Sequence, residues 1–249
     1  MSNDSIKKNK LSKQSLRLKI ASNVVLGVLV LSVGTLCLAP MEKGIETQGN
    51  ESNIYRNAGE SGVGVSLMFN VYWGTEEVYR ILEILKNHNA KSTFFIGGCW
   101  ADDNVECLRA IFADGHEIGN HGYFHKDQAK MNLSQNQKEI VECNRFIELA
   151  IGIKPTLFAP PSGAYSYDTL TAASALNMKT ILWSKDTIDW RDKDSSIIYT
   201  RATKNIKIGD FVLMHPMAET ANALDNILKY YESKDISVVT VTENLQLEG

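Results

Sequence analysis

From Val65 onward the sequence alternates short apolar runs with segments whose apolar residues follow a helical spacing, such as Val78, Ile81, Leu82 and Leu85. Repeated strand–helix units require a parallel sheet. Seven such units within about 190 residues predict an α/β fold, an incomplete (β/α) barrel of about seven parallel strands, rather than a doubly wound sheet. The runs suit buried parallel strands; they are Val65–Phe69, Ser92–Ile96, Glu117–Gly119, Leu157–Ala159, Thr180–Trp183, Phe211–Met214 and Val238–Val241.

The amino-terminal part of the chain differs in character. Residues 1–19 carry six basic side chains and one acidic one, and residues 20–41 carry no charge. A helix over 20–41 would span about 33 Å, enough for a hydrocarbon core of about 30 Å. The one-sided basic flank predicts a cytoplasmic amino terminus and an extracytoplasmic remainder. Residues 42–62 are polar, without an apolar period, and indicate a linker before a domain over 63–249.

Two interpretations of residues 20–41 remain open. They form either a retained signal anchor in the membrane or a secretory signal that is cut after the small residue Ala39. Pro40 directly after that point disfavours cleavage, so the anchor is preferred.

The charge balance excludes one class of partner. The chain has 26 basic and 29 acidic residues, a net charge of −3, but without the basic arm 20 basic and 28 acidic residues remain. Phosphate contacts dominate nucleic-acid affinity and need basic side chains. A body of charge −8 therefore predicts no nucleic-acid partner.

Polar residues gather directly after the predicted strands. The carboxyl ends of parallel strands meet at one edge of a barrel, where barrel enzymes build their sites. This edge therefore predicts a functional site. Its members are Asn70 after the first strand, His121 and His125 after the third, Pro160–Gly163 after the fourth, Asp186 and Asp189 after the fifth, and His215 at the end of the sixth.

The histidines and aspartates suggest two pieces of chemistry. His121 and His125 are four residues apart, a spacing that lets both imidazoles converge on Zn²⁺, although catalytic zinc usually has a third protein ligand. His215, with Asp189 as its partner, would make a general acid able to protonate a leaving amine. The remaining candidates have plainer interpretations: Asp186 serves a turn, His116 is a hydrogen-bonded structural residue, and His88 is solvated late in a helix.

These motifs resemble the polysaccharide deacetylases (carbohydrate esterase family four), metal-dependent enzymes that remove acetyl groups from N-acetylated glycans. The resemblance covers residues 65–245 and depends on three ordered motifs, and the Trp73-Gly74 variant of a fourth is most similar to the sporulation-associated branch. The three motifs are Gly115–His125, Asp186-Thr187-Ile188-Asp189-Trp190 and Leu213-Met214-His215.

The resemblance implies a role for each matching position. His121 and His125 would be metal ligands, with zinc as the expected metal, and His215 would be the catalytic acid tuned by Asp189. The backbone N–H of Ser162 would line an oxyanion hole. Leu213 and Trp190 would wall an acetyl pocket, and the partner would be an N-acetylglucosamine-containing glycan such as peptidoglycan, met at the outer face of the membrane, in a secreted form or in the spore envelope.

The chain departs from the family pattern at its first motif. Asn70 stands at the position of the catalytic base, Val71 at that of the metal-binding aspartate, and Ala159 at that of an arginine that orients the base. An amide cannot accept a proton at ordinary pH, and an alkyl side chain cannot bind a metal. Losing the arginine together with its carboxylate leaves no unpaired charge in the cleft.

Three hypotheses follow. The first is an extracytoplasmic, metal-dependent de-N-acetylase of a cell-wall or spore polysaccharide, slow or impaired. The second is a non-catalytic member of the same fold that binds the glycan. The third, an acyl-transfer triad of Ser162, His215 and Asp189, is disfavoured because Pro161-Ser162-Gly163 lacks the turn that exposes a nucleophilic serine.

Overall fold

The computed structural model describes residues 53–247, which contain one sheet of eight strands, all paired in parallel. The strands follow the order β1-β6-β5-β4-β3-β2-β8-β7, and β1 and β7 are its two edges, so the barrel is open. This confirms the predicted incomplete (β/α) barrel. The strands are β1 (Ile54–Tyr55), β2 (Ser66–Val71), β3 (Thr93–Ile96), β4 (Glu117–Asn120), β5 (Leu157–Phe158), β6 (Lys179–Ile181), β7 (Lys185–Asp186) and β8 (Phe211–Met214).

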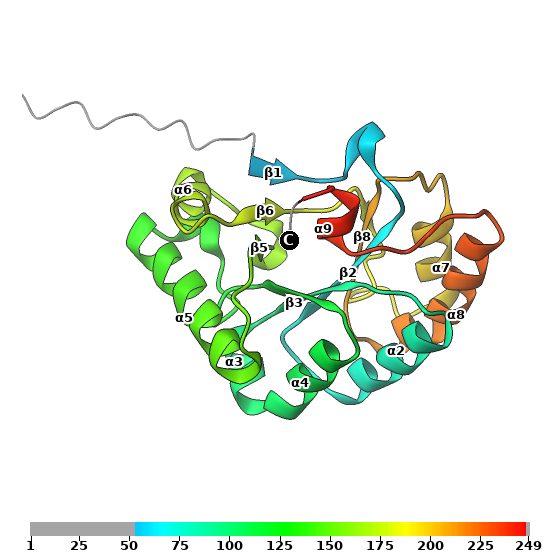
Figure 1. The fold of residues 1–249 in the computed structure, drawn as a ribbon, viewed down its shortest axis with the longest axis horizontal. Helices are drawn as coiled ribbons and strands as arrows, with labels where there is room; N and C mark the ends of the chain where they lie inside the picture. Colours follow the sequence, from blue (N-terminus) through cyan, green and yellow to red (C-terminus); the bar gives the residue numbers. More distant parts are fainter. Residues whose placement is uncertain (1–52, 248–249) are drawn as a thin grey trace, which may run out of the picture. The chain divides into compact units, whose positions relative to one another are not determined.

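Helices cover the outer face of this sheet, and in Figure 1 α5, α3, α4, α2, α8 and α7 follow one another along an arc outside the strands. They turn their apolar stripes toward the strands, and Val78, Ile81, Leu82 and Leu85 of α2 are buried as their spacing predicts. The helices are α2 (Glu76–Asn87), α3 (Gly98–Asp103), α4 (Val105–Ala113), α5 (Leu133–Ile151), α6 (Tyr167–Ala175), α7 (Ser195–Thr203), α8 (Ala218–Glu232) and α9 (Val241–Asn244), with short 3-10 turns at Gly59–Ser61, Gln128–Lys130 and Pro161–Gly163.

Strand β2 shows how the two faces of the sheet differ. Leu67, Phe69 and Val71 belong to the large apolar cluster beneath the helices. Met68 belongs to the smaller cluster on the inner face. Because side chains alternate along a strand, Asn70 shares the inner face with Met68. The end of β2 therefore presents an amide to the inside of the barrel and an alkyl side chain to the helix layer.

The inner face is packed tightly enough to require a glycine. Gly119 of β4 lies opposite Phe95 of β3. A Cβ added at Gly119 would come within 2.4 Å of Cδ1 of Phe95, far inside van der Waals contact. The phenyl ring thus fills the space that a side chain at Gly119 would need. His121 follows two residues later, at the carboxyl end of β4.

The prediction of a seventh strand over Val238–Val241 is wrong for most of these residues. Val238 makes only an isolated parallel bridge to Val65, and Val241 already begins α9. The reason is local: the Thr240 side chain accepts a hydrogen bond from the backbone N–H of Glu243, and the Glu243 carboxylate accepts one from the backbone N–H of Thr240. This capping box starts a helix where hydrophobicity alone indicated a strand.

The end of the predicted linker is also structured. Ile54–Tyr55 forms β1, which pairs with β6, and Ala58 is buried against the inner cluster. The predicted arm (1–19), the membrane segment (20–41) and most of the linker (42–62) lie outside the described residues. Within 53–247, none of the helices combines the length and the apolar character needed to cross a bilayer.

Candidate functional site

The predicted site residues come together at the carboxyl ends of the strands. Phe69 of β2 pairs with Met214 of β8, so the next residues, Asn70 and His215, leave neighbouring strands at the same level. His121 follows β4, and its ring centroid lies 5.0 Å from that of His125. Two aromatic rings connect this pair to His215, since Tyr72 stacks on His125, Trp73 stacks on His215, and Tyr72 and Trp73 meet edge-on.

His121 is held as a neutral imidazole. It is fully buried, and its Nδ1 donates a hydrogen bond to the carbonyl of Ala159 at 2.7 Å. Burial, helped by the charges of His125 and His215, lowers the pKa of His121 to about 3. Nε2 therefore carries the lone pair, and this nitrogen is buried without a hydrogen-bond partner in the described part of the chain.

His125 adopts a left-handed backbone with a φ of 52° and turns its ring toward His121. The ring of Tyr72 stacks on that of His125, with a centroid distance of 3.5 Å and an interplanar angle of 21°. Burial lowers the pKa of His125, and His215 adds to this effect. The pKa of the Tyr72 phenol is raised, first by burial and then by the charge of Asp189.

The second part of the site is a histidine–aspartate pair. Nδ1 of His215 lies 2.7 Å from Oδ1 of Asp189, whose carboxylate is almost fully buried. The other carboxylate oxygen accepts hydrogen bonds from the backbone N–H of His215 and from the Thr220 hydroxyl, both at 2.6 Å. A carboxylate only accepts, so Nδ1 is the protonated nitrogen of His215 and Nε2 is left for a ligand. The contact between His215 and Asp189 is therefore as predicted, while its role as a general acid stays a prediction.

Two members of this part were missed in the sequence. Thr220 lies in the first turn of α8 and holds Asp189, but a threonine at a helix start gives no signal of its own. The ring of Trp73 stacks on His215 with a centroid distance of 5.5 Å and an angle of 14°. Asp186 has the predicted turn role, because its side chain accepts a hydrogen bond from the N–H of Ile188 at 2.8 Å.

The first motif supplies no carboxylate. Asn70 is 2% exposed, and its Oδ1 is buried without a hydrogen-bond partner among the described residues. Val71 packs in the outer apolar cluster, so its side chain points away from the histidines. Ala159 lies in the inner cluster, where its methyl group leaves Asn70 without a charged neighbour from this position.

These residues do not make a complete metal site. His121 and His125 offer two nitrogen ligands, whereas a catalytic zinc takes three protein ligands and a water. Between residues 53 and 247 there is no group of three or more histidine, cysteine, aspartate or glutamate side chains arranged to hold a metal ion. The donor set therefore falls one ligand short of what the resemblance implies.

The predicted substrate-binding residues border the site in different ways. Leu213 of β8 is buried, and its carbonyl accepts a hydrogen bond from the Thr187 hydroxyl. Trp190 is 53% exposed and offers its ring to solvent. Ser162 is exposed in the turn after β5 with a φ of 57°, and within the described residues it makes no hydrogen bond to His215, so the acyl-transfer triad is not formed.

Two histidines lie outside the site. His116 is buried and accepts a hydrogen bond from the backbone N–H of Ser92 at 3.2 Å, and burial lowers its pKa to about 4, so its structural role is confirmed. The prediction of a solvated His88 is wrong. Its ring lies 2.7 Å from the carboxylate of Glu232 and 3.0 Å from that of Asp225, and only 10% of its side chain is exposed.

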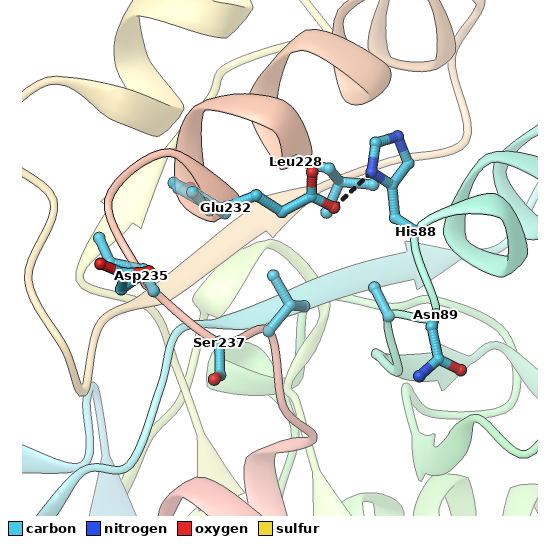
Figure 2. Close-up of a pocket in the computed structure, with 10 residues that line it drawn as sticks. His88, Asn89, Leu228, Glu232, Asp235 and Ser237 are labelled. Atoms are coloured by element: carbon cyan, nitrogen blue, oxygen red, sulfur yellow. Dashed lines mark hydrogen bonds and ion pairs between the residues drawn. The ribbon is translucent and has the colours of Figure 1, made fainter.

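His88 also borders a cavity of about 470 Å³, drawn in Figure 2. The cavity lies near the amino ends of β2 and β3, between the end of α2, the end of α8 and the segment that leads to Val238. It is thus at the edge of the sheet opposite to the His121–His215 site. None of the side chains that resemble a catalytic group of the family lines it.

Comparisons with known proteins agree with this geometry. A model of the family described as polysaccharide deacetylase matches residues 59–181. YlxY of Bacillus subtilis is 39% identical over 179 residues, which are 72% of this chain and 56% of YlxY. A peptidoglycan-N-acetylglucosamine deacetylase of Bacillus cereus is 30% identical over 187 residues, 73% of this chain and 68% of the enzyme. The chain thus spans little more than half the length of YlxY.

Solved structures give the same result. BA3943 of Bacillus anthracis, described as a CE4 family pseudoenzyme, superposes with a TM-score of 0.75 at 35% identity and covers 77% of this chain and 68% of that one. The Bc1960 peptidoglycan N-acetylglucosamine deacetylase has a TM-score of 0.76 at 27% identity, over 79% of this chain and 94% of that one. The fold, the order of the motifs and these similarities show that the chain belongs to the polysaccharide deacetylase family.

Proposed function

We propose that this protein binds an N-acetylglucosamine-containing glycan such as peptidoglycan outside the cytoplasm, and that its capacity to de-N-acetylate that glycan is impaired. Two relatives support the ligand class, since both are named peptidoglycan-N-acetylglucosamine deacetylases, one from Bacillus cereus and one from Listeria monocytogenes. The extracytoplasmic location follows from the basic arm and the uncharged residues 20–41, with the membrane anchor as the preferred interpretation.

The observation that carries the proposal is the end of β2. Asn70 faces the site where a base would take a proton from the attacking water, and its amide cannot do so. A general base contributes a factor of about 10²–10⁴ to the rate. Val71, turned into the helix layer, supplies no ligand to the histidine pair. The chain therefore lacks both means by which a water could be activated at this position.

The binding half of the site is retained. His215 is fixed by Asp189 and Thr220, with Nε2 left for a hydrogen bond to a sugar. Trp73 stacks on His215 and meets Tyr72 edge-on, and Trp190, the residue after Asp189, exposes its ring to solvent. Aromatic faces of this kind pack well against the apolar faces of pyranose rings. BA3943, a described pseudoenzyme of similar fold, supports a member without turnover.

A second candidate function, a slow de-N-acetylase, is favoured by the His215–Asp189 pair. In such an enzyme this pair would protonate the departing amine, so turnover would explain its presence. The two candidates differ in acetate release and not in glycan binding. Membership of the sporulation-associated branch stays a prediction from the Trp73-Gly74 motif.

The test uses the purified full chain with N-acetylglucosamine oligomers and with peptidoglycan. We expect binding by calorimetry and no acetate release above that of the variant His215→Ala. Trp190→Ala should weaken binding, whereas Phe112→Ala, an exposed aromatic on the outer helix α4, is the matched control and should not. Acetate release that His215→Ala abolishes would establish the slow enzyme instead, and absence of any glycan binding would refute the proposal.

A further inference from the structure

The loop from His121 to His125 has an unusual backbone. Gly122 and His125 both lie in the left-handed region, with φ values of 72° and 52°. This region is sparsely populated for a residue with a side chain, and the strain persists only where the surrounding structure enforces it. The position of the His125 ring therefore depends on contacts between the loop and the rest of the protein.

Two helices supply these contacts. The carbonyl of Tyr123 accepts a hydrogen bond from the N–H of Cys99, in the first turn of α3, at 2.8 Å. One carboxylate oxygen of Glu139, on α5, accepts hydrogen bonds from the N–H groups of Tyr123 at 3.1 Å and of Phe124 at 2.8 Å. Both backbone polar groups of Tyr123 are thus paired, and the N–H directly before His125 is held by a side chain.

Glu139 is a buried carboxylate whose partners lie on both sides of His125 in the sequence. Its side chain is 5% exposed, and its second oxygen pairs with Nζ of Lys126 at 3.2 Å. Burying a carboxylate is unfavourable unless hydrogen bonds and an opposite charge compensate for the lost hydration. The N–H of Phe124 and the ammonium group of Lys126 provide this compensation, so Glu139 fixes the chain before and after the histidine.

A row of contacting rings leads from His125 to His215. His125 stacks on Tyr72 with ring centroids 3.5 Å apart, and Tyr72 meets Trp73 edge-on at 3.9 Å. Trp73 in turn stacks on His215 at 5.5 Å. Each ring limits the space open to the next, so a displaced His125 would free Tyr72 and then Trp73 to change their orientation.

We propose that Glu139 is a positioning residue of the glycan site, which holds the ring of Trp73 against His215 by fixing the loop that carries His125. The inference rests on the proposed function, because it names a residue that sets the affinity of that same site for N-acetylglucosamine oligomers. Glu139 acts through the loop, since its carboxylate is buried against backbone N–H groups. What this role requires is an acceptor oxygen and not the negative charge.

The test separates the acceptor oxygen from the charge and from stability. Glu139→Gln keeps an acceptor oxygen, Glu139→Leu removes it at similar size, and Lys126→Ala removes the ion pair. Ile147→Ala, which removes buried atoms about two turns further along α5, controls for a loss of stability alone. Calorimetry on the full chain measures the dissociation constant for the oligomers, hydrogen–deuterium exchange measures the protection of residues 121–126, and thermal unfolding shows that each variant is folded.

We expect Glu139→Leu to lose protection of the loop and to bind the oligomers at least about tenfold more weakly than the wild type. Glu139→Gln, Lys126→Ala and Ile147→Ala should keep a dissociation constant within about threefold of the wild-type value.

Glu139→Leu with wild-type affinity would overturn the inference, as would an equal loss of affinity in Glu139→Gln or in Ile147→Ala. Rapid exchange of the loop in the folded wild type would overturn it even if Glu139→Leu does not fold. A wild type that binds no oligomer would refute the proposed function instead, while the exchange of Glu139→Leu and Glu139→Gln would still show whether Glu139 fixes the loop.

Discussion

Asn70 and Ala159 alter the site together. In the family pattern the two positions hold a carboxylate and the arginine that orients it, and both would be buried charges near the inner face. Here Asn70 is 2% exposed and Ala159 is fully buried among apolar side chains. Removing only one partner would leave an unpaired charge at a cost of several kcal/mol. With both positions uncharged, the site lacks the base but leaves no buried charge unpaired, and the side chains around Asn70 and Ala159 stay packed.

The first prediction restores that base. Asn70→Asp, assayed with zinc, should raise acetate release from N-acetylglucosamine oligomers by about 10²-fold over the wild type, the lower part of the effect of a general base. Asn70→Gln is the control with no new carboxylate. Equal rates in the two variants would contradict the prediction.

The residues of the site were predictable from the sequence to different degrees. His121, His125, Asp189 and His215 follow strands and have few structural roles there, so their position identified them. Tyr72 and Trp73 were not assigned a role, because an aromatic residue after an apolar run has the same pattern as a core residue. Which of these rings reaches the site depends on the side-chain alternation along β2, and therefore on the residue at which the strand ends, Val71.

At the scale of elements, α2 and α8 are joined by an ionisable contact. His88, at the end of α2, lies between the carboxylates of Asp225 and Glu232 on α8, and Figure 2 shows the His88–Glu232 contact beside the cavity. Burial alone would lower the pKa of His88, but the hydrogen bonds to Asp225 and Glu232 outweigh it and raise the pKa above its usual value. The protonated imidazole is thus favoured in the folded state.

The second prediction concerns the pH dependence of this contact. A pKa raised on folding stabilises the protein fully below the unfolded value of about 6.5, and this stabilisation is lost as the pH rises through the folded pKa. The free energy of unfolding of the wild type, relative to His88→Gln, should therefore be larger at pH 5.5 than at pH 9. Urea unfolding at pH 5.5 and pH 9 measures this free energy. His116→Gln is the comparison variant, because burial lowers the pKa of His116 and the pH dependence should then have the opposite sign. A difference independent of pH would contradict the prediction.

Elements were predictable where hydrophobic pattern and local hydrogen bonding agreed. Most of the first six strands lie within one or two residues of their predicted positions, since each is an apolar run between a turn and a helix. The seventh failed because the Thr240–Glu243 capping box competes with the strand pattern. Strands β1 and β7 have two residues each and are defined by pairing with β6 and β8 rather than by their own sequence.

At the scale of the whole molecule, the open parallel sheet explains why all the site residues lie at one edge of the sheet. All eight strands run the same way, so every carboxyl end lies at one edge and every loop that follows can add a side chain there. The histidine pair comes from the β4 loop, the acid from the end of β8 and its carboxylate from the loop after β7. The opposite edge carries the His88 cavity, which none of the side chains of the His121–His215 site lines.

The third prediction concerns the side of the membrane on which the domain lies. Residues 1–19 carry six basic side chains, and residues 20–41 carry none and no acids, so the domain should be delivered outside the cytoplasm while the amino terminus remains inside. Alkaline phosphatase, which needs an oxidising compartment for its disulfides, should be active when fused after residue 249 and inactive in the same fusion lacking residues 20–41.

The mass of the recovered protein separates the two interpretations of this segment. A retained anchor leaves the full chain of 27.7 kDa in the membrane fraction, whereas cleavage after Ala39 releases a shorter chain into the soluble fraction. Because Pro40 follows the only small residue at the end of the run, we expect the full mass, and Pro40→Ala should increase the cleaved fraction. Phosphatase activity that persists without residues 20–41 would show that another part of the chain directs export. An inactive fusion of the full chain would place the site inside the cell and refute the proposed peptidoglycan partner.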